Sequence, residues 1–89
     1  MSYRRLEIQN IKGLHARASA KLVEVVEAFD ADAKVSKDGE TTGGDSIMGL
    51  LMLAASMGSH IEVETSGPQA EELAIAIENL VNDKFGEGD

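Results

Sequence analysis

The sequence contains no cysteine and no tryptophan, a single proline, and only three aromatic residues among its 89. Without cysteine the chain can form neither disulfides nor thiolate metal sites, which fits a reducing compartment such as the cytoplasm. The scarcity of aromatic residues predicts a core built from Leu, Ile, Val, Ala and Met. A chain of this length has room for one core, so a single domain over residues 1–89 is expected.

Long apolar runs are also missing. No stretch approaches the 18 continuous apolar residues of a transmembrane span, so no membrane insertion is expected. The first ten residues, MSYRRLEIQN, lack the apolar run of a secretory signal peptide. These observations together predict a cytoplasmic protein.

Positive charge is scarce, with eight Lys and Arg against sixteen Asp and Glu, for a net charge of −8. Such a surface repels nucleic acid, and the strands offer no pairs of exposed aromatics, so a nucleic-acid-binding domain is the weakest alternative. The cations are unevenly distributed, because five of the eight lie in the first 21 residues: Arg4, Arg5, Lys12, Arg17 and Lys21. This clustering favours a local anion site near the N-terminus.

The hydrophobic periodicity changes repeatedly along the chain between the strand period of two and the helical period of 3.6. It predicts, in order, a strand over 4–10, a helix over 16–29, a hairpin over 33–42, a helix over 45–58, a strand over 59–66 and a helix from 66 to 86. Asp38-Gly39 suits a type I′ hairpin turn. We expect residues 87–89 to form a frayed tail.

This element order predicts an α+β fold. The strands alternate between apolar and polar residues, which is typical of antiparallel sheets with one solvated face. We therefore expect an open-faced sandwich of order βαββαβα, in which a four-stranded, mostly antiparallel sheet carries three helices on one face. Ser66 and Gln69 have the spacing of a capping box for the last helix.

The predicted helix over 45–58 is apolar on two sides. Ile47, Leu50, Leu51 and Ala54 form one stripe, while Met48 and Met52 lie off it. Deep burial on all sides is not expected in so small a domain. Because methionine adapts to irregular contacts, we interpret Met48 and Met52 as part of a surface that faces a partner protein.

The segment GLHARAS, residues 13–19, places His15 where the first helix begins, a position usually occupied by Ser, Thr, Asp or Asn. The first turn of a helix offers unpartnered N–H groups and partial positive charge, and Arg17 adds a guanidinium suited to phosphate. An imidazole in this setting can accept a phosphoryl group on a ring nitrogen, although the residues alone do not indicate which nitrogen. A single surface histidine often has no function, and His60, on the wet face of a strand, is interpreted that way. The two histidines are far apart in sequence and lack a carboxylate cluster, so no metal site is expected.

GLHARAS resembles the active-site signature of the HPr family, the histidine-containing phosphocarriers of the bacterial phosphoenolpyruvate-dependent phosphotransferase system. A second block, GGDSIMGLLMLAASMGSHIEV, is similar to the family's segment around its second helix and fourth strand. Two motifs at the family's spacing are more specific than either alone, and the resemblance covers essentially the whole chain.

The resemblance implies roles for particular residues. His15 would carry the phosphoryl group on Nδ1, and Arg17 would steady the phosphoryl oxygens. Enzyme I would donate the group, which comes from phosphoenolpyruvate, and an enzyme IIA domain would accept it. Partner docking would fall on Ile47, Met48, Leu51 and Met52. No cofactor is implied, and a monomer is expected.

Ser46 falls where part of the family is phosphorylated by a dedicated HPr kinase/phosphorylase, although an N-cap role alone also explains a serine there. Two positions depart from the common family pattern: Ala18 replaces a proline, and Asp45 replaces a residue that is often basic. These departures leave open a regulatory carrier resembling the nitrogen-related branch. A further alternative is a non-catalytic interaction module in which His15 is a relic.

Overall fold

The computed structural model describes residues 1–87. Its elements follow in the order β1 (Ser2–Glu7), α1 (Ala16–Glu27), β2 (Asp32–Lys37), β3 (Glu40–Gly43), α2 (Ile47–Met52), β4 (His60–Ser66), α3 (Ala70–Asn82) and the short 3₁₀ helix η1 (Lys84–Gly86). Within residues 1–87 no helix combines the length and apolarity needed to cross a bilayer.

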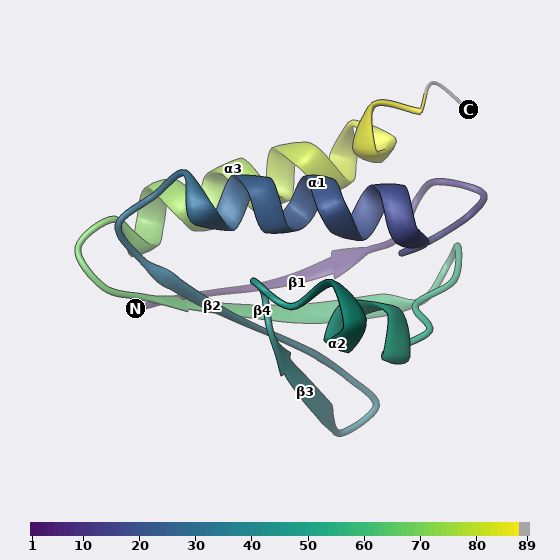
Figure 1. Cartoon of the computed structure of the whole chain (residues 1–89), viewed down its shortest axis with the longest axis horizontal. Helices are drawn as coiled ribbons and strands as arrows, with labels where there is room; N and C mark the ends of the chain where they lie inside the picture. Colours follow the sequence, from purple (N-terminus) through teal and green to yellow (C-terminus); the bar gives the residue numbers. More distant parts are fainter. Residues whose placement is uncertain (88–89) are drawn as a thin grey trace.

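The four strands form one sheet in the order β1-β4-β2-β3, and every neighbouring pair is antiparallel. β4 therefore lies between β1 and β2, as Figure 1 shows. Its alternation is the predicted one, since Ile61, Val63 and Thr65 are fully buried and the residues between them are not. Asp38 and Gly39 both have positive φ, which is the geometry that a type I′ turn requires.

Helices α1 and α3 lie side by side over one face of the sheet, and α2 packs beside α1 and β3 (Figure 1). The opposite face carries polar side chains such as Lys34, Ser36 and Glu64. The α+β open-faced sandwich expected from the sequence is thus confirmed. The core is aliphatic except for one aromatic ring; its largest fully buried apolar side chains are Phe85, Ile8, Leu22, Leu50, Ile61, Leu73, Ile77, Val35, Val63 and Val81.

The second helix is much shorter than the predicted 45–58, because α2 ends at Met52. Leu53 is its C-cap, and the next residue, Ala54, has φ of 54°. That left-handed conformation stops a helix, and it is usually supplied by glycine rather than by alanine. The sequence therefore gave no sign of the stop, and residues 55–59 form a loop that leads into β4.

The third helix also differs from the prediction at both ends. Its N-cap is Gln69 rather than Ser66, and no side chain caps it, so the expected capping box does not form. The Gln69 carboxamide oxygen instead accepts the backbone N–H of Asp30 at 2.7 Å. The helix ends at Asn82 and is followed by η1, which lies at the same end of the molecule as the start of α1 (Figure 1). Of the predicted frayed tail, residues 88–89 lie outside the described residues, whereas Glu87 makes defined contacts.

Candidate functional site

His15 is the N-cap of α1, with extended backbone angles, as the sequence indicated. The preceding loop is held against the segment after α2, since Leu14 N–H donates to the Ala55 carbonyl at 2.9 Å. Gly13 makes this contact possible, because a Cβ at that position would lie 2.3 Å from the same carbonyl oxygen, and its φ is +64°. The tight turn places His15 at the start of the helix, with its side chain 27% exposed.

The first turn of α1 leaves backbone donors available. Ser19 N–H is the first to close a helical hydrogen bond, to the His15 carbonyl at 2.8 Å. The amides of residues 16 to 18 therefore have no acceptor within the helix. Together with the positive end of the helix dipole they make the kind of anion site that binds phosphate, and the Arg17 side chain is exposed in the same turn.

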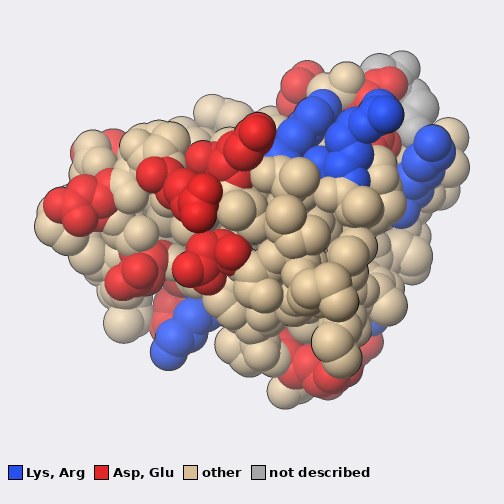
Figure 2. Space-filling model, in the orientation of Figure 1, with Lys and Arg blue, Asp and Glu red and all other residues tan. Residues whose placement is uncertain are grey.

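A hollow of about 270 Å³ adjoins His15, and Lys12, Arg17, Lys21, Gly86 and Glu87 line it with the histidine. Figure 2 shows Lys and Arg gathered at this corner of the molecule, over the start of α1, while Asp and Glu occupy the surface toward its far end. The clustering of positive charge expected from the sequence is thus present in the fold, with three cations around one imidazole.

Two of the five N-terminal cations do not take part in this site. Arg4 pairs with Glu71 at 2.9 Å and with Glu78 at 3.2 Å, and so ties β1 to α3. Arg5 pairs with Glu62 at 3.4 Å across the sheet. Charge counting along the sequence could not separate these cations from those that surround His15, because the separation depends on which carboxylates the fold brings next to Arg4 and Arg5.

Glu87 is the site residue that the sequence did not reveal. One carboxylate oxygen contacts His15 Nε2, and the other accepts from Asn10 Nδ2 at 3.0 Å. Only 11% of the Glu87 side chain is exposed. The hydrogen bond from the His15 ring, and then the one from the Asn10 amide, lower the pKa of the Glu87 carboxyl group, so the group is ionised at neutral pH.

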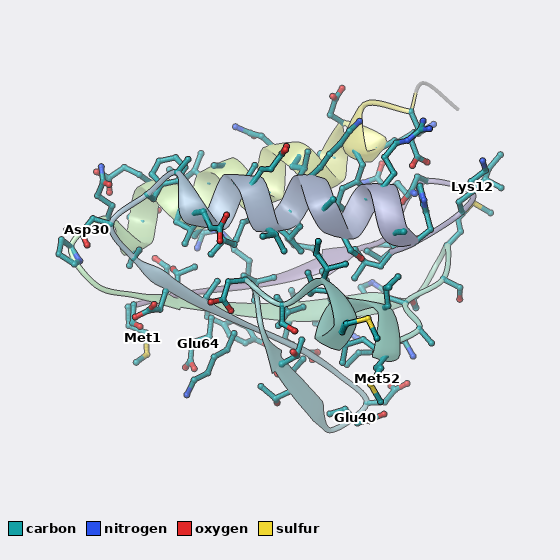
Figure 3. All side chains as sticks on the ribbon, viewed as in Figure 1. Met1, Lys12, Asp30, Glu40, Met52 and Glu64 are labelled. Atoms are coloured by element: carbon teal, nitrogen blue, oxygen red, sulfur yellow. The ribbon has the colours of Figure 1, made fainter. Side chains whose placement is uncertain are left out.

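The predicted docking residues form an exposed apolar surface on α2. Met48 and Met52 are 70% and 73% exposed, Ile47 is exposed as well, and Leu51 is half-buried. Figure 3 places Met52 on α2 and Lys12 in the loop before α1. The sequence missed two further exposed apolar side chains, Ile11 and Met57, which lie in the two loops that pack against each other beside His15. We call Ile11, Ile47, Met48, Met52 and Met57 the apolar surface.

Ser46 caps α2, as expected, and its hydroxyl accepts the backbone N–H of Gly49 at 3.0 Å. The residue is half-buried, and Asp45 beside it is exposed. His60, the second histidine, begins β4 opposite Glu7 of β1. In the described part of the chain no three His, Asp or Glu side chains are grouped as a metal site would require.

Comparison with known proteins agrees with this arrangement. Residues 3–83 match the family model described as the PTS HPr component phosphorylation site. The chain belongs to the HPr family. Among curated HPr-family relatives, the phosphocarrier protein HPr of Cupriavidus necator is 44% identical over 89 residues, which is all of both chains. The phosphocarrier protein NPr of Escherichia coli K12 is 42% identical over 83 residues, or 92% of each chain.

Solved structures of HPr-family proteins share the fold. The crystal structure of HPr-C-His from Thermoanaerobacter tengcongensis superimposes with a TM-score of 0.93 over 98% of both chains, at 36% sequence identity. HPr from Bacillus anthracis superimposes with a TM-score of 0.86, covering 90% of this chain and 95% of that one, at 38% identity. The membership supports a role as a phosphocarrier of the phosphotransferase system.

Proposed function

We propose that this protein accepts a phosphoryl group from phospho-enzyme I on His15 and passes it to an enzyme IIA domain. The observation that carries the proposal is the half-exposed imidazole at the start of α1, beside free helical amides and within one hollow with Arg17. In the forward step a ring nitrogen lone pair attacks phosphorus, and the bond from phosphorus to the donor breaks with its electron pair returning to the donor.

The surrounding groups fit the charge that this step moves. The transferred group carries negative charge on its oxygens, which helical N–H groups and a guanidinium can stabilise by hydrogen bonds. Arg17 is exposed and no ion pair is described for it within residues 1–87, so its donors can turn to the phosphoryl oxygens.

Incubation with phosphoenolpyruvate and enzyme I tests the proposal. The protein should gain the mass of one phosphoryl group, and the bond should be acid-labile and base-stable, as expected for a phosphohistidine. Transfer from the labelled protein to a panel of IIA domains, of sugar and nitrogen-related types, then distinguishes the two branches. A protein that stays unlabelled while known HPr is labelled in the same mixture would instead favour a non-catalytic interaction module.

Met48→Asp should slow phosphoryl transfer by weakening partner docking. Met48 is 70% exposed, so an acidic side chain there costs little fold stability but places a charge on the apolar surface. We expect the concentration giving half-maximal transfer from enzyme I to rise about tenfold, the effect of losing one strong interface contact. Steady-state transfer kinetics measure this change.

Ile75→Asp is the matched control for this prediction. Ile75 is 44% exposed and lies on α3, outside the apolar surface. Its replacement introduces the same charge at an exposed apolar position and should leave the half-maximal concentration unchanged. Equal effects of the two variants would show that net charge, rather than the apolar surface, governs docking.

We also propose that Ser46 accepts a regulatory phosphate. Its hydroxyl is held by Gly49 N–H, so a phosphate there keeps an acceptor for that amide while adding negative charge beside Ile47 and Met48. Incubation with ATP and an HPr kinase should give an acid-stable phosphate in the peptide that contains Ser46. A kinase that labels its own HPr but leaves this protein unmodified would refute this proposal, and Asp45 next to the serine would be the first residue to replace with lysine.

A further inference from the structure

Glu87 and Asn10 form a chain of hydrogen bonds that ends on the histidine. Asn10 is fully buried, and its Nδ2 donates both to the Gly13 carbonyl at 2.9 Å and to Glu87 Oε1 at 3.0 Å. The second carboxylate oxygen, Oε2, contacts His15 Nε2. One carboxylate therefore joins Asn10 and His15, and it belongs to a residue that lies 72 positions after His15 in the sequence.

The orientation of the Asn10 amide is determined by its surroundings. Rotating the amide by half a turn would place Asn10 Oδ1 against two oxygen atoms that can only accept, the Gly13 carbonyl and Glu87 Oε1. The observed orientation is kept although it leaves Oδ1 without a partner in the described part of the chain. Both Asn10 hydrogens are thus committed, and Glu87 Oε1 must be an acceptor.

The Glu87 carboxylate in turn constrains the histidine. An ionised carboxylate has no hydrogen to donate, so His15 Nε2 must carry the proton in this contact. A neutral imidazole has one N–H and one lone pair, and the lone pair is then on Nδ1. We propose that Glu87 is a positioning residue that holds His15 in the Nε2–H tautomer and so keeps a lone pair on Nδ1, the nitrogen that the family resemblance already implies as the phosphoryl acceptor.

The same contact suits the phosphorylated ring, given the proposed function. When Nδ1 bonds to phosphorus, the neutral ring becomes a cation that still carries its proton on Nε2. No proton has to leave or arrive during the forward step. The Glu87 carboxylate faces the nitrogen that keeps this proton and offsets the positive charge that the ring gains.

Glu87→Gln tests the assignment with almost no change in size. The Asn10 N–H will select the Gln oxygen as its acceptor, which turns the Gln amide hydrogens toward His15 Nε2. A donor facing Nε2 requires a lone pair there and moves the ring proton to Nδ1. We expect ¹⁵N NMR of the imidazole nitrogens to show Nε2–H in the unmodified protein and Nδ1–H in the variant.

Kinetics should follow the change of tautomer. We expect the maximal rate of phosphorylation by enzyme I to fall about tenfold or more, as when the group that orients a functional imidazole is replaced. The enzyme I concentration at half-maximal rate should not change, because Glu87 is only slightly exposed and lies outside the apolar surface. Glu72→Gln, at an exposed position of α3, is the control and should behave as the unmodified protein.

The two readouts separate this inference from the proposed function. The tautomer is measured without any phosphoryl donor, so Nδ1–H in the unmodified protein, or an unchanged Nε2–H in Glu87→Gln, would overturn the role of Glu87 alone. A protein with the expected tautomers that accepts no phosphoryl group would overturn the phosphocarrier function and leave the contact intact. A purely structural role for Glu87 would alter melting temperature but not the ring tautomer.

Discussion

His15→Ala is expected to take up no phosphoryl group from phosphoenolpyruvate and enzyme I, whereas His60→Ala is labelled as fast as the unmodified protein. The chain contains two histidines, and His15 is the one that borders the hollow with Lys12, Arg17 and Lys21. Removing the proposed nucleophile should prevent the covalent intermediate altogether, so the loss should be complete rather than graded. Mass spectrometry of the intact protein at neutral or alkaline pH measures the outcome.

The loss in His15→Ala should not reflect unfolding. The imidazole makes no side-chain cap hydrogen bond and is partly exposed, so its removal leaves the core of α1 unchanged. Far-ultraviolet circular dichroism and the urea midpoint should therefore stay close to those of the unmodified protein, apart from the small contribution of the Glu87 contact. Phosphoryl labelling that persists in His15→Ala and disappears in His60→Ala would show that His60 carries the phosphoryl group, and would contradict the proposed role of His15.

The sequence predicted the part of the candidate site that depends only on local structure, namely the residues at the start of α1. A residue at the start of a strongly periodic helix has free amides beside it whatever the rest of the fold does, and this made His15 and Arg17 candidates before the family resemblance implied their roles. The exposure of Met48 and Met52 followed from the same reasoning, because a small domain cannot bury a helix on two sides. These predictions needed no knowledge of the tertiary structure.

Glu87 could not be found this way, because its contacts with Asn10 and His15 cross almost the whole chain. In the sequence it looks like the first residue of a polar tail. A weak signal does precede it, since Phe85 is a large apolar residue after the helical period has ended, followed by glycine. An apolar residue that must be buried there requires the chain to fold back rather than to fray.

The errors in the helix boundaries have a related origin. Periodicity correctly predicted the position of α2 but not its length, because Ala54 adopts φ of 54° and the next residue, Ala55, accepts the backbone N–H of Leu14 from the loop before α1. The Ser66–Gln69 spacing suggested a capping box, yet the Gln69 side chain binds the backbone of Asp30 at the end of the α1 segment. In both cases a tertiary contact decided between alternatives that the local sequence left equal.

Phe85→Ala is expected to cost about 3–5 kcal/mol in the free energy of unfolding, the usual range for a buried phenylalanine. Phe85 is fully buried, whereas Phe29 is only partly buried against the core, so the loss of the Phe85 ring removes the largest fully buried side chain described in residues 1–87. Tyr3→Ala is the control, because that ring is 58% exposed on the open face of the sheet, and its loss should cost less than about 1 kcal/mol. Urea denaturation followed by circular dichroism measures both values.

The consequence of Phe85→Ala for the site distinguishes its anchoring role from simple stabilisation. The Phe85 carbonyl accepts Lys21 Nζ at 2.6 Å, and Glu87 follows two residues later, so the buried ring fixes both groups beside His15. In the absence of urea, where the variant is still folded, the fraction of His15 rings that carry the proton on Nε2 should decrease, although Glu87 itself is unchanged. A variant that is destabilised by the full amount yet keeps the tautomer would show that the Glu87 contact holds the C-terminal turn in place without the ring. If the tautomer is partly lost, as we expect, a cavity in the core acts in the same way as a change at the Glu87 carboxylate. The packing of Phe85 in the core then determines the protonation pattern of the His15 ring.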